Sequence, residues 1–411
     1  MVRVAEAEHD QRYPLKDKRA DAADAFRRAS AYHAELREIH KYFMPFRAST
    51  TARAGSAGSG TEGDAKAQHL YDGTGPSSMF AFVSNMKADW MPAFQDFFLL
   101  KNGPLYVGNN KAERAEYLQG ATRVIHGLTG RVRGTATEEM FSDLFAGTGA
   151  LVLKKGTRSN PIQGFAVPVM ETAMEAGPQG THDRWFWKRK YKARHIEPEW
   201  PDATIPPRLL DVIRKDRNAD VGVTQYTYLD YRDEVYRTCV WTDFDAETAL
   251  WSEYTRTSPW ITPRLFVVPG EGMGRGFAHL GLPFVKTANK ARELSLRAAA
   301  FALLGLWTRR NDNVFNEKTA AMVPGAMWKV GSNGGPMGPT IARLDMPKNF
   351  DVSTIVIKDE RDQIRRVLLD DDIPDINDKV RSPTEIAALP PGEGLTADQL
   401  PEPWRTAART T

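Results

Sequence analysis

The most constraining feature of the sequence is a glycine-dense segment between an apolar run and a long segment of helical composition. Residues 260–268 are mostly apolar and β-like, and GEGMGRG follows them. After Pro283 the chain contains no Pro or Gly until Gly305. Glycine permits positive φ and close backbone approach. We therefore expect a structural joint that turns the chain from a compact layer into one long helix, formed by Gly270, Gly272, Gly274 and Gly276.

Downstream of the joint the sequence predicts a helix, a small insert and a second helix. Residues 283–304 and 350–370 have helical patterns, the latter with Ile357 and Ile364 on one face. The segment between them is rich in Gly and Pro, which predicts short loops and strands. Two helices that flank a small β insert can form a stalk with a tip.

Charged side chains follow one stripe of the first of these helices. Lys286, Lys290, Glu293 and Arg297 recur there at i, i+4, i+7 and i+11. On the second helix, Lys358, Arg361 and Arg365 lie on a different face from the apolar residues. Because unpaired charges are costly to bury, we expect these side chains to face water, a partner or a polyanion.

The N-terminal part predicts several helices. Apolar residues recur at helical spacing over 17–46 and again after the turn at Tyr71, and shorter helices are predicted at 111–126 and 137–145. Residues 49–64 have the low complexity of a loop. His33 and His40 are two helical turns apart, too far for one metal ion, so we expect both on the solvent face of the first helix.

From 164 to 242 the pattern changes to β-strands. Residues 221–231 and 235–241 are rich in β-branched and aromatic side chains. WFWKRKY, at 185–191, mixes aromatic and basic residues. It is either a strand with one aromatic and one solvated basic face, which is the favoured interpretation, or a surface that stacks on bases. The expected fold class is α+β.

Length and composition limit the class of protein further. A chain of 411 residues predicts two or three domains. The net charge of +3 excludes neither a nucleic-acid nor an acidic partner. The single cysteine, Cys239, allows no internal disulfide and no cysteine-built metal site, which fits a reducing cytoplasm. The polar N-terminus has no signal-peptide core and the longest apolar run is about half a membrane span, so we expect a soluble chain.

Motifs of common enzymes are missing from the sequence. It contains no Walker A, HExxH, GxSxG or EF-hand pattern, and GEGMGRG lacks the spacing and the downstream acid of a dinucleotide site. The acidic residues of 359–372 are interpreted as solvated charges rather than as a two-metal nuclease site. These observations favour a protein that is not an enzyme and uses no cofactor or metal. A nucleotide-using enzyme built on the glycine-rich joint is the minority hypothesis.

Six segments, in the same order, resemble the head-to-tail connector, or portal, proteins of short-tailed bacteriophages. The resemblance covers roughly residues 20 to 388, and its most specific parts are LYDGTGP, GEGMGRG and LPFVKTANK. The six segments are 70–100, 145–153, 164–180, 259–276, 282–299 and 324–330.

This resemblance implies a portal-type subunit that assembles into a ring, usually a dodecamer. In order along the chain, it implies an α/β wing at 1–276, a first stem helix at 277–305, a clip at 306–349, a second stem helix at 350–374, and a partly irregular C-terminal segment at 375–411. The last segment is shorter than usual, because RSPTEI at 381–386 resembles the start of the family's long channel-side helix but is followed at once by Leu389-Pro390-Pro391.

The implied function is a ring at the capsid vertex through which DNA is packaged and ejected. The implied partners are other copies of the chain, non-specific double-stranded DNA, the terminase large subunit, capsid and scaffolding proteins, and a tail adaptor, with no membrane. The implied location is the virion, after assembly in the host cytoplasm. Another structural virion protein, such as a tail adaptor, is the alternative.

Two groups of site residues follow from this assignment. Candidates for the DNA channel are Lys286, Lys290, Arg297, Lys358, Arg361 and Arg365. Candidates for partner contacts on the clip are Arg309, Arg310, Trp328 and Lys329. A channel should contact phosphates weakly and without sequence preference, and cations balanced by acids provide such a surface.

Overall fold

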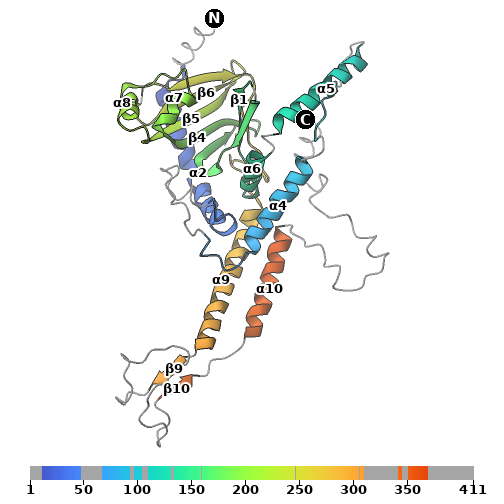
Figure 1. The fold of residues 1–411 in the computed structure, drawn as a ribbon, viewed down its shortest axis with the longest axis vertical. Coiled ribbons are helices and arrows are strands. Elements are labelled where there is room, and N and C mark those ends of the chain that lie inside the picture. Colours follow the sequence, from blue (N-terminus) through green and yellow to red (C-terminus); the bar gives the residue numbers. More distant parts are fainter. Residues whose placement is uncertain are drawn as a thin grey trace, which may run out of the picture.

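The computed structural model describes residues 12–47, 67–92, 97–103, 110–130, 134–158, 160–245, 247–304, 306–309, 341–344 and 350–368. In this part of the chain, helices and sheets form a body from which two long helices extend to a small two-stranded sheet (Figure 1). The α+β fold class expected from the sequence is confirmed.

The largest sheet of the body is an antiparallel meander in the order β3-β4-β5-β6-β7. Neighbours in sequence are neighbours in space. Short hairpin loops join β3 to β4 and β5 to β6, whereas residues 193–219 connect β4 to β5. The predicted strands at 221–231 and 235–241 are confirmed as β5 and β6. The bounds are β3 Thr172–Ala176, β4 His182–Lys192, β5 Asp220–Asp230, β6 Val235–Thr242 and β7 Trp251–Thr255.

WFWKRKY lies in a strand, β4, as the favoured interpretation expected, but at 185–187 both faces of the strand are covered rather than one being solvated. Trp185 and Trp187 are buried in one apolar cluster, and Phe186, between them, is fully buried in another. The indole rings are therefore not available to stack on bases, and the opposite face is not solvated at Phe186. The basic half of the segment is more exposed, with the Arg189 guanidinium stacked on Trp187 at 3.5 Å from the ring centroid.

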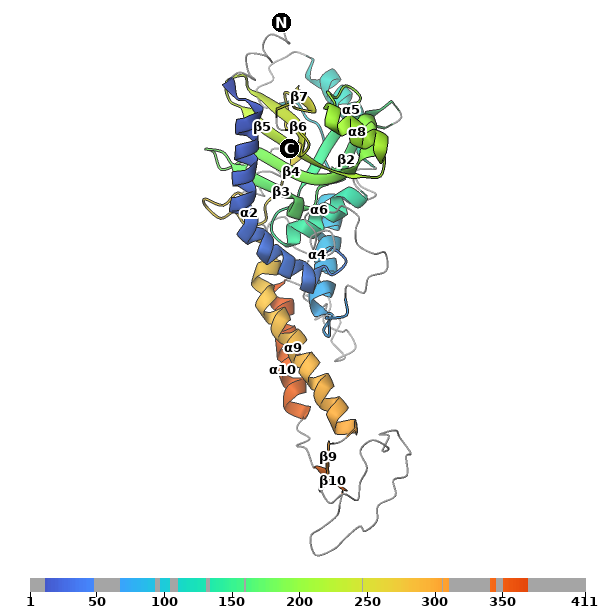
Figure 2. The same ribbon diagram turned by 90° about the vertical axis from the view of Figure 1, so that its left-hand side faces the viewer.

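Helix α2 (Leu15–Phe43) lies along one face of this sheet (Figure 2). Its first half presents Ala22 and Ala25 to Phe186, Tyr226 and Trp241. The small alanine side chains let the helix approach the aromatic surface closely, and the ring of Phe186 stacks on Tyr226 with centroids 4.3 Å apart. The sheet is thus the platform on which the N-terminal helix is fixed.

The remaining body elements surround this platform. A second antiparallel sheet has the order β2-β1-β8. Its strands are β1 Leu151–Thr157, β2 Asn160–Ala166 and β8 Trp260–Ile261. The helices are α4 Thr74–Trp90, α5 Lys111–Thr129, α6 Thr135–Phe145, α7 Ile196–Glu199 and α8 Pro207–Lys215, with short 3-10 turns η1 Val169–Glu171 and η2 Ala193–His195.

The main apolar core lies where the body meets the long helices. Phe43 of α2 and Phe82 of α4 both contact Phe145 of α6, with ring centroids 5.4 and 5.3 Å apart. Val285, on the first long helix, is buried in the same cluster. Burial of such a side chain stabilises the fold by about 1.5–3 kcal/mol. The long helices are therefore anchored by apolar packing rather than by a flexible link.

The two long helices are α9 (Phe277–Leu304) and α10 (Phe350–Val367), which pack side by side (Figures 1 and 2). Beyond the far end of α9, β9 (Leu306–Arg309) pairs antiparallel with β10 (Ile341–Leu344). Buried Ile357, Ile364 and Leu368 confirm the apolar face predicted for the second helix. Residues 369–374, which the sequence assigned to the end of this helix, lie outside the described residues.

The helical pattern in the sequence starts at Pro283, but helix α9 begins six residues earlier, at Phe277. Proline suits the first turn of a helix because its missing N–H has no partner there. Here Pro283 lies inside the helix and cannot donate a hydrogen bond to the carbonyl of His279. The true start, Phe277, directly follows Gly276, so the glycine joint and the helix are continuous.

The expectation that His33 and His40 face solvent is wrong. Their side chains are 6% and 3% exposed. The Nε2 atom of His33 lies 2.9 Å from the carbonyl oxygen of Thr172 at the start of β3. The two-turn spacing did place both rings on one side of the helix, but that side packs against the body.

Candidate functional site

The glycines of GEGMGRG lie in close backbone contact with the turn at 147–149. A Cβ on Gly274 would lie 2.7 Å from the carbonyl oxygen of Gly147, and one on Gly276 would lie within 3.0 Å of three backbone atoms of 145–147. The Gly274 N–H donates to the buried hydroxyl of Thr148 at 2.7 Å. Only residues without a side chain fit at 274 and 276, which gives both glycines a structural reason.

The other two glycines serve different purposes. Gly270 has φ +84°, a left-handed conformation that favours glycine, whereas a Cβ at this position would meet no atom within 4 Å. Gly272 approaches the carbonyl of Met174 on β3, where a Cβ would collide. Its own carbonyl lies 2.5 Å from Nε2 of His182. The four glycines thus turn the chain and seat it on the large sheet.

His182 is held between the joint and the end of β8. A carbonyl oxygen can only accept, so Nε2 carries the proton donated to Gly272, and Nδ1 accepts from the Thr262 hydroxyl at 2.8 Å. Burial, assisted by the charge of nearby Arg264, lowers the pKa of His182 to about 4. The ring is therefore neutral at physiological pH.

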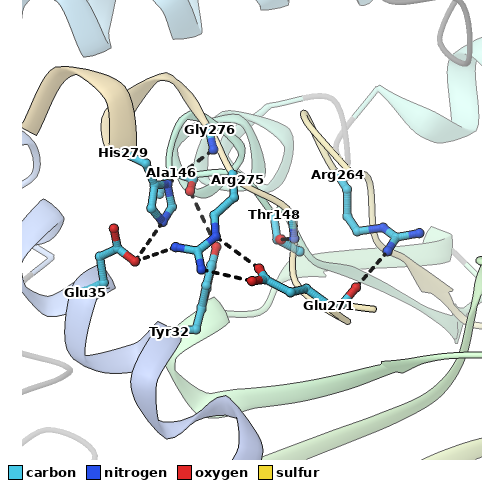
Figure 3. Close-up of polar contacts among 10 residues, drawn as sticks. Tyr32, Glu35, Ala146, Thr148, Arg264, Glu271, Arg275, Gly276 and His279 are labelled. Atoms are coloured by element: carbon cyan, nitrogen blue, oxygen red, sulfur yellow. Dashed lines mark hydrogen bonds and ion pairs between the residues drawn. The ribbon is translucent and has the colours of Figure 1, made fainter. Parts of the chain in front are cut away.

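Arg275, inside GEGMGRG, connects the joint to α2 (Figure 3). It pairs with Glu271 through Nε and Nη2 at 3.0 and 3.2 Å, and with Glu35 of α2 through Nη1. His279, at the start of α9, lies with Nε2 3.8 Å from the same Glu35 carboxylate. The hydrogen bonds that Arg275 donates to Glu271, followed by its interaction with Glu35, raise the pKa of Arg275 despite partial burial. We call this set, Glu35, Glu271, Arg275 and His279, the shoulder network.

The turn before α4 forms a second connection between the body and the long helices. The Asn289 side chain, on α9, accepts the backbone N–H groups of Tyr71 and Asp72 at 2.7 and 3.2 Å and donates to the carbonyl of His69 at 3.1 Å. The buried carboxylate of Asp72 accepts the N–H of Thr74 at 2.9 Å and one hydrogen bond from Nε of Arg361 on α10, with which it forms an ion pair. Asp72, Asn289 and Arg361 are named the clasp.

The candidate cations of α9 are each paired with an acid. Lys286 pairs with Glu38 of α2. Lys290 and Arg297 both pair with Glu293, one turn away from each. The structure therefore presents this predicted stripe as a row of compensated charges on a partly exposed helix face.

The candidates on α10 lie together. Lys358, Arg361 and Arg365 line one hollow with Arg292 of α9, which was not among the residues predicted from the sequence. Of the clip candidates, Arg309 lies at the end of β9, whereas Arg310, Trp328 and Lys329 fall outside the described residues. The structure thus brings the α10 cations together with one from α9.

A buried ionisable cluster near the main core was also not predicted. Arg47, just after α2, reaches Asp143 of α6, with Nη2 3.1 Å from Oδ2, and His40 Nε2 lies 4.0 Å from the other oxygen. Burial raises the pKa of Asp143 to about 6, although the charge of Arg47 acts in the opposite direction. Burial and the charge of Arg47 together lower the pKa of His40 to about 4. No local pattern links 40, 47 and 143, so only the fold reveals the cluster.

Two kinds of site are absent from the described residues. No group of three or more His, Cys, Asp or Glu side chains in this part of the chain is placed to hold a metal ion. Among the same residues, no helix is long and apolar enough to cross a membrane. Near the long helices, the polar features of the described residues include the joint, the clasp, the buried cluster at Asp143 and the charged faces of α9 and α10.

Comparison with known proteins identifies the family. Among curated proteins, none matches the chain. The family model described as "Bacteriophage head to tail connecting protein" matches residues 16–390, which is most of the chain. This family consists of structural virion proteins rather than enzymes. The chain therefore belongs to the bacteriophage head-to-tail connecting proteins, and is a component of the virion that associates with head and tail parts.

Proposed function

We propose that this chain is the portal subunit of its phage, forming a ring at the capsid vertex through which DNA is packaged and ejected. The observation that carries the proposal is the α9–α10 pair, which extends from the body and ends in the β9–β10 sheet. The body is the wing, α9 and α10 are the two walls of the stem, and the segment that includes β9 and β10 is the clip.

The two connections between body and stem support this assignment. The shoulder network fixes the start of α9 to α2, and the clasp fixes both long helices to the turn before α4. A stem that carries load during DNA translocation needs a defined angle to the wing, and these contacts supply it at two separate points. The glycines permit the close packing that fixes this angle.

The charges of the stem support a DNA channel. Lys286, Lys290 and Arg297 are balanced by nearby acids. Repeated around a ring, such pairs give a shallow potential that attracts phosphate without holding it tightly, as sliding DNA requires. The channel candidates of α10, Lys358, Arg361 and Arg365, add further cations.

The partners of the ring follow from its parts. Neighbouring subunits meet head to tail, because a closed ring needs heterologous contacts. The clip, with Arg309, Arg310, Trp328 and Lys329, docks the terminase large subunit during packaging and the tail adaptor afterwards. The wing meets capsid and scaffolding proteins at the vertex.

Particle mass and shape test the proposal. The purified full chain, measured by native mass spectrometry and negative-stain imaging, is expected to form rings of about a dozen subunits with a stem. A stable monomer at all salt concentrations would contradict the proposal. A ring without a stem would favour a tail adaptor instead.

A further inference from the structure

Helix α5 extends from the body, and most of its surface is left uncovered by the described part of the chain (Figure 1). Of its residues, only Thr122 and His126 are buried. The Thr122 hydroxyl accepts the N–H of Leu100 at 3.0 Å, and the His126 ring stacks on Phe98 with centroids 4.2 Å apart. One side of the helix is therefore used for packing on the body.

A different side of α5 carries apolar side chains that are exposed. Tyr117 and Val124 lie two helical turns apart and are 74% and 62% exposed. Ala121 and Leu128, which are half-buried, complete a run at i, i+4, i+7 and i+11. Such spacing is typical of a helix that packs against another element along one stripe. We call Tyr117, Ala121, Val124 and Leu128 the outer face of α5.

Two glycines lie beside the outer face. Gly120 and Gly127 are seven residues apart, and both are exposed. Glycine is one of the least favourable residues in a helix interior. A Cβ at either position would meet no atom within 4 Å outside the backbone of the helix itself, so no close contact among the described residues requires glycine there. The two notches suit a second helix, because the side chains at a contact set how closely two helix axes approach.

A second copy of the chain offers a surface that fits the outer face. Helix α2 lies on the flank of the body opposite α5 (Figure 2). Its outward side carries exposed Ala23, Ala31 and Ala34, together with Arg27, whose charge is paired with Asp24. Neighbours in a closed ring meet through different surfaces. An α5–α2 contact meets that requirement, whereas α5 against α5 would join only two copies.

We propose that the outer face of α5 packs on the outward side of α2 of the neighbouring copy. The inference rests on the proposed function, and it names the surfaces by which one subunit recognises the next. Tyr117 and Val124 supply the apolar area that becomes buried, and the alanines of α2 leave room for them. From 117 to 128 and from 23 to 34 the helix rises by the same amount, about 17 Å at 1.5 Å per residue.

Leucines placed in the two notches test the proposal. Gly120→Leu with Gly127→Leu should leave α5 folded, because leucine is a better helix former than glycine and both positions are open. In a packed interface, the same side chains would force the two helices apart. We expect the subunit concentration at which half of the chains are assembled, measured by mass photometry, to rise by about thirtyfold or more.

Gln119→Leu is the matched control. It adds a leucine at an exposed position of the same helix, outside the outer face. This variant should assemble as wild type does. The melting temperature of each variant, measured below its assembly concentration, should equal that of wild type or exceed it, which separates loss of assembly from loss of folding.

Disulfide trapping identifies the partner surface. The only native cysteine, Cys239, is buried. Val124→Cys is combined in turn with Ala23→Cys, Ala31→Cys or Ala34→Cys, and the assembled chain is oxidised. A contact between different faces links each copy to two neighbours, so at least one pair should give a ladder of dimers, trimers and larger products on denaturing electrophoresis. Val124→Cys alone should give no cross-linked product.

The outcomes distinguish this inference from the proposed function. If rings form but the double-leucine variant assembles as the Gln119→Leu control does, or if no cysteine pair gives a ladder, the inference is wrong and the portal proposal stands. Dimers from Val124→Cys alone would show that α5 meets α5, and double-leucine rings that form normally but fail to enter capsids would assign the face to a capsid protein. Either result overturns the inference. A ladder from an assembly that is not a ring would support the α5–α2 contact and contradict the portal proposal, whereas a monomer at all concentrations would contradict both.

Discussion

Arg361 on α10 donates from Nε to one oxygen of the buried Asp72 carboxylate at 2.8 Å, and its Nη2 lies 2.6 Å from the same oxygen, across a sequence separation of 289 residues. The second Asp72 oxygen accepts the N–H of Thr74 at the start of α4. One side chain therefore ties the beginning of a body helix to the second long helix, and Asn289 ties the same turn to the first. The angle between body and stem depends on this turn.

Removal of the Asp72 charge should loosen the clasp. Burial raises the pKa of Asp72, but hydrogen bonds from Thr74 and Arg361 outweigh it, so the net shift is downward. The contribution to stability is thus present above the unfolded-state pKa and lost as pH falls through the folded-state value. Asp72→Asn should lower the free energy of unfolding by about 1.5–3 kcal/mol near neutral pH, measured by urea denaturation.

Asp359→Asn is the matched control for the clasp. Asp359 is exposed on α10, the helix that carries Arg361, and among the described residues it accepts a hydrogen bond only from Gln363. It should change stability by no more than about 0.5 kcal/mol. Equal effects of the two variants would mean that the Asp72–Arg361 contact does not stabilise the fold.

A methyl group at Gly276 should disrupt the joint. Gly276→Ala places a Cβ against backbone atoms of 145–147, which cannot move without displacing α6. We expect a loss of about 1–3 kcal/mol in unfolding free energy. Gly73→Ala, where a Cβ would meet nothing within 4 Å, should change it by less than about 1 kcal/mol. Comparable melting temperatures for the two variants would contradict the close packing described for the joint.

Acid should weaken the joint through His182. Its folded-state pKa of about 4 is below the ordinary histidine value of 6.5. The unfolded state therefore binds more protons between these values, and stability falls as pH decreases from 6.5 to 4, by up to about 3 kcal/mol from this residue. His182→Gln should show a flatter loss over this window in denaturation measured at several pH values.

The comparison must be made between variants, because other buried groups titrate in the same range. His40, with a pKa of about 4, adds to the loss of stability on acidification. Asp143, with a pKa raised to about 6, opposes that loss over most of the window, below about pH 6. An identical pH dependence in wild type and His182→Gln would show that protonation of His182 does not destabilise the fold.

Charge reversal on α9 should reduce DNA retention without preventing assembly. Lys286→Glu with Lys290→Glu places new acids beside Glu38 and Glu293, and so replaces compensated pairs by repulsive ones. Rings should persist, while the amount of DNA protected from nuclease in assembled particles should fall. Normal DNA content would remove both lysines from the channel.

The sequence predicted the elements well and their contacts poorly. Strands β5 and β6, and the apolar face of α10, were predicted because periodicity and β-branched composition are local signals. The helical pattern placed the start of α9 too late, at Pro283, which lies within the helix. That prediction relied on the local position of Pro283, whereas tertiary packing determines where the helix begins.

The candidate site depended on relationships that no local pattern contains. The clasp joins 72, 289 and 361, and the shoulder network joins 35 to 271–279. The burial of His33 and His40 arises because α2 packs on both the large sheet and the main core. Arg292 was not predicted because its neighbours in space, Lys358 and Arg365, lie more than sixty residues away along the chain.

The central claim is that α9 and α10 form the wall of an axial channel. An averaged electron cryomicroscopy map of the assembled ring tests it most directly, because the two helices can be located relative to the symmetry axis. The account predicts that both helices of every subunit surround the axis, with the hollow that Arg292 and Lys358 help to line accessible from the channel. Helices at the outer rim, with the body nearest the axis, would contradict it.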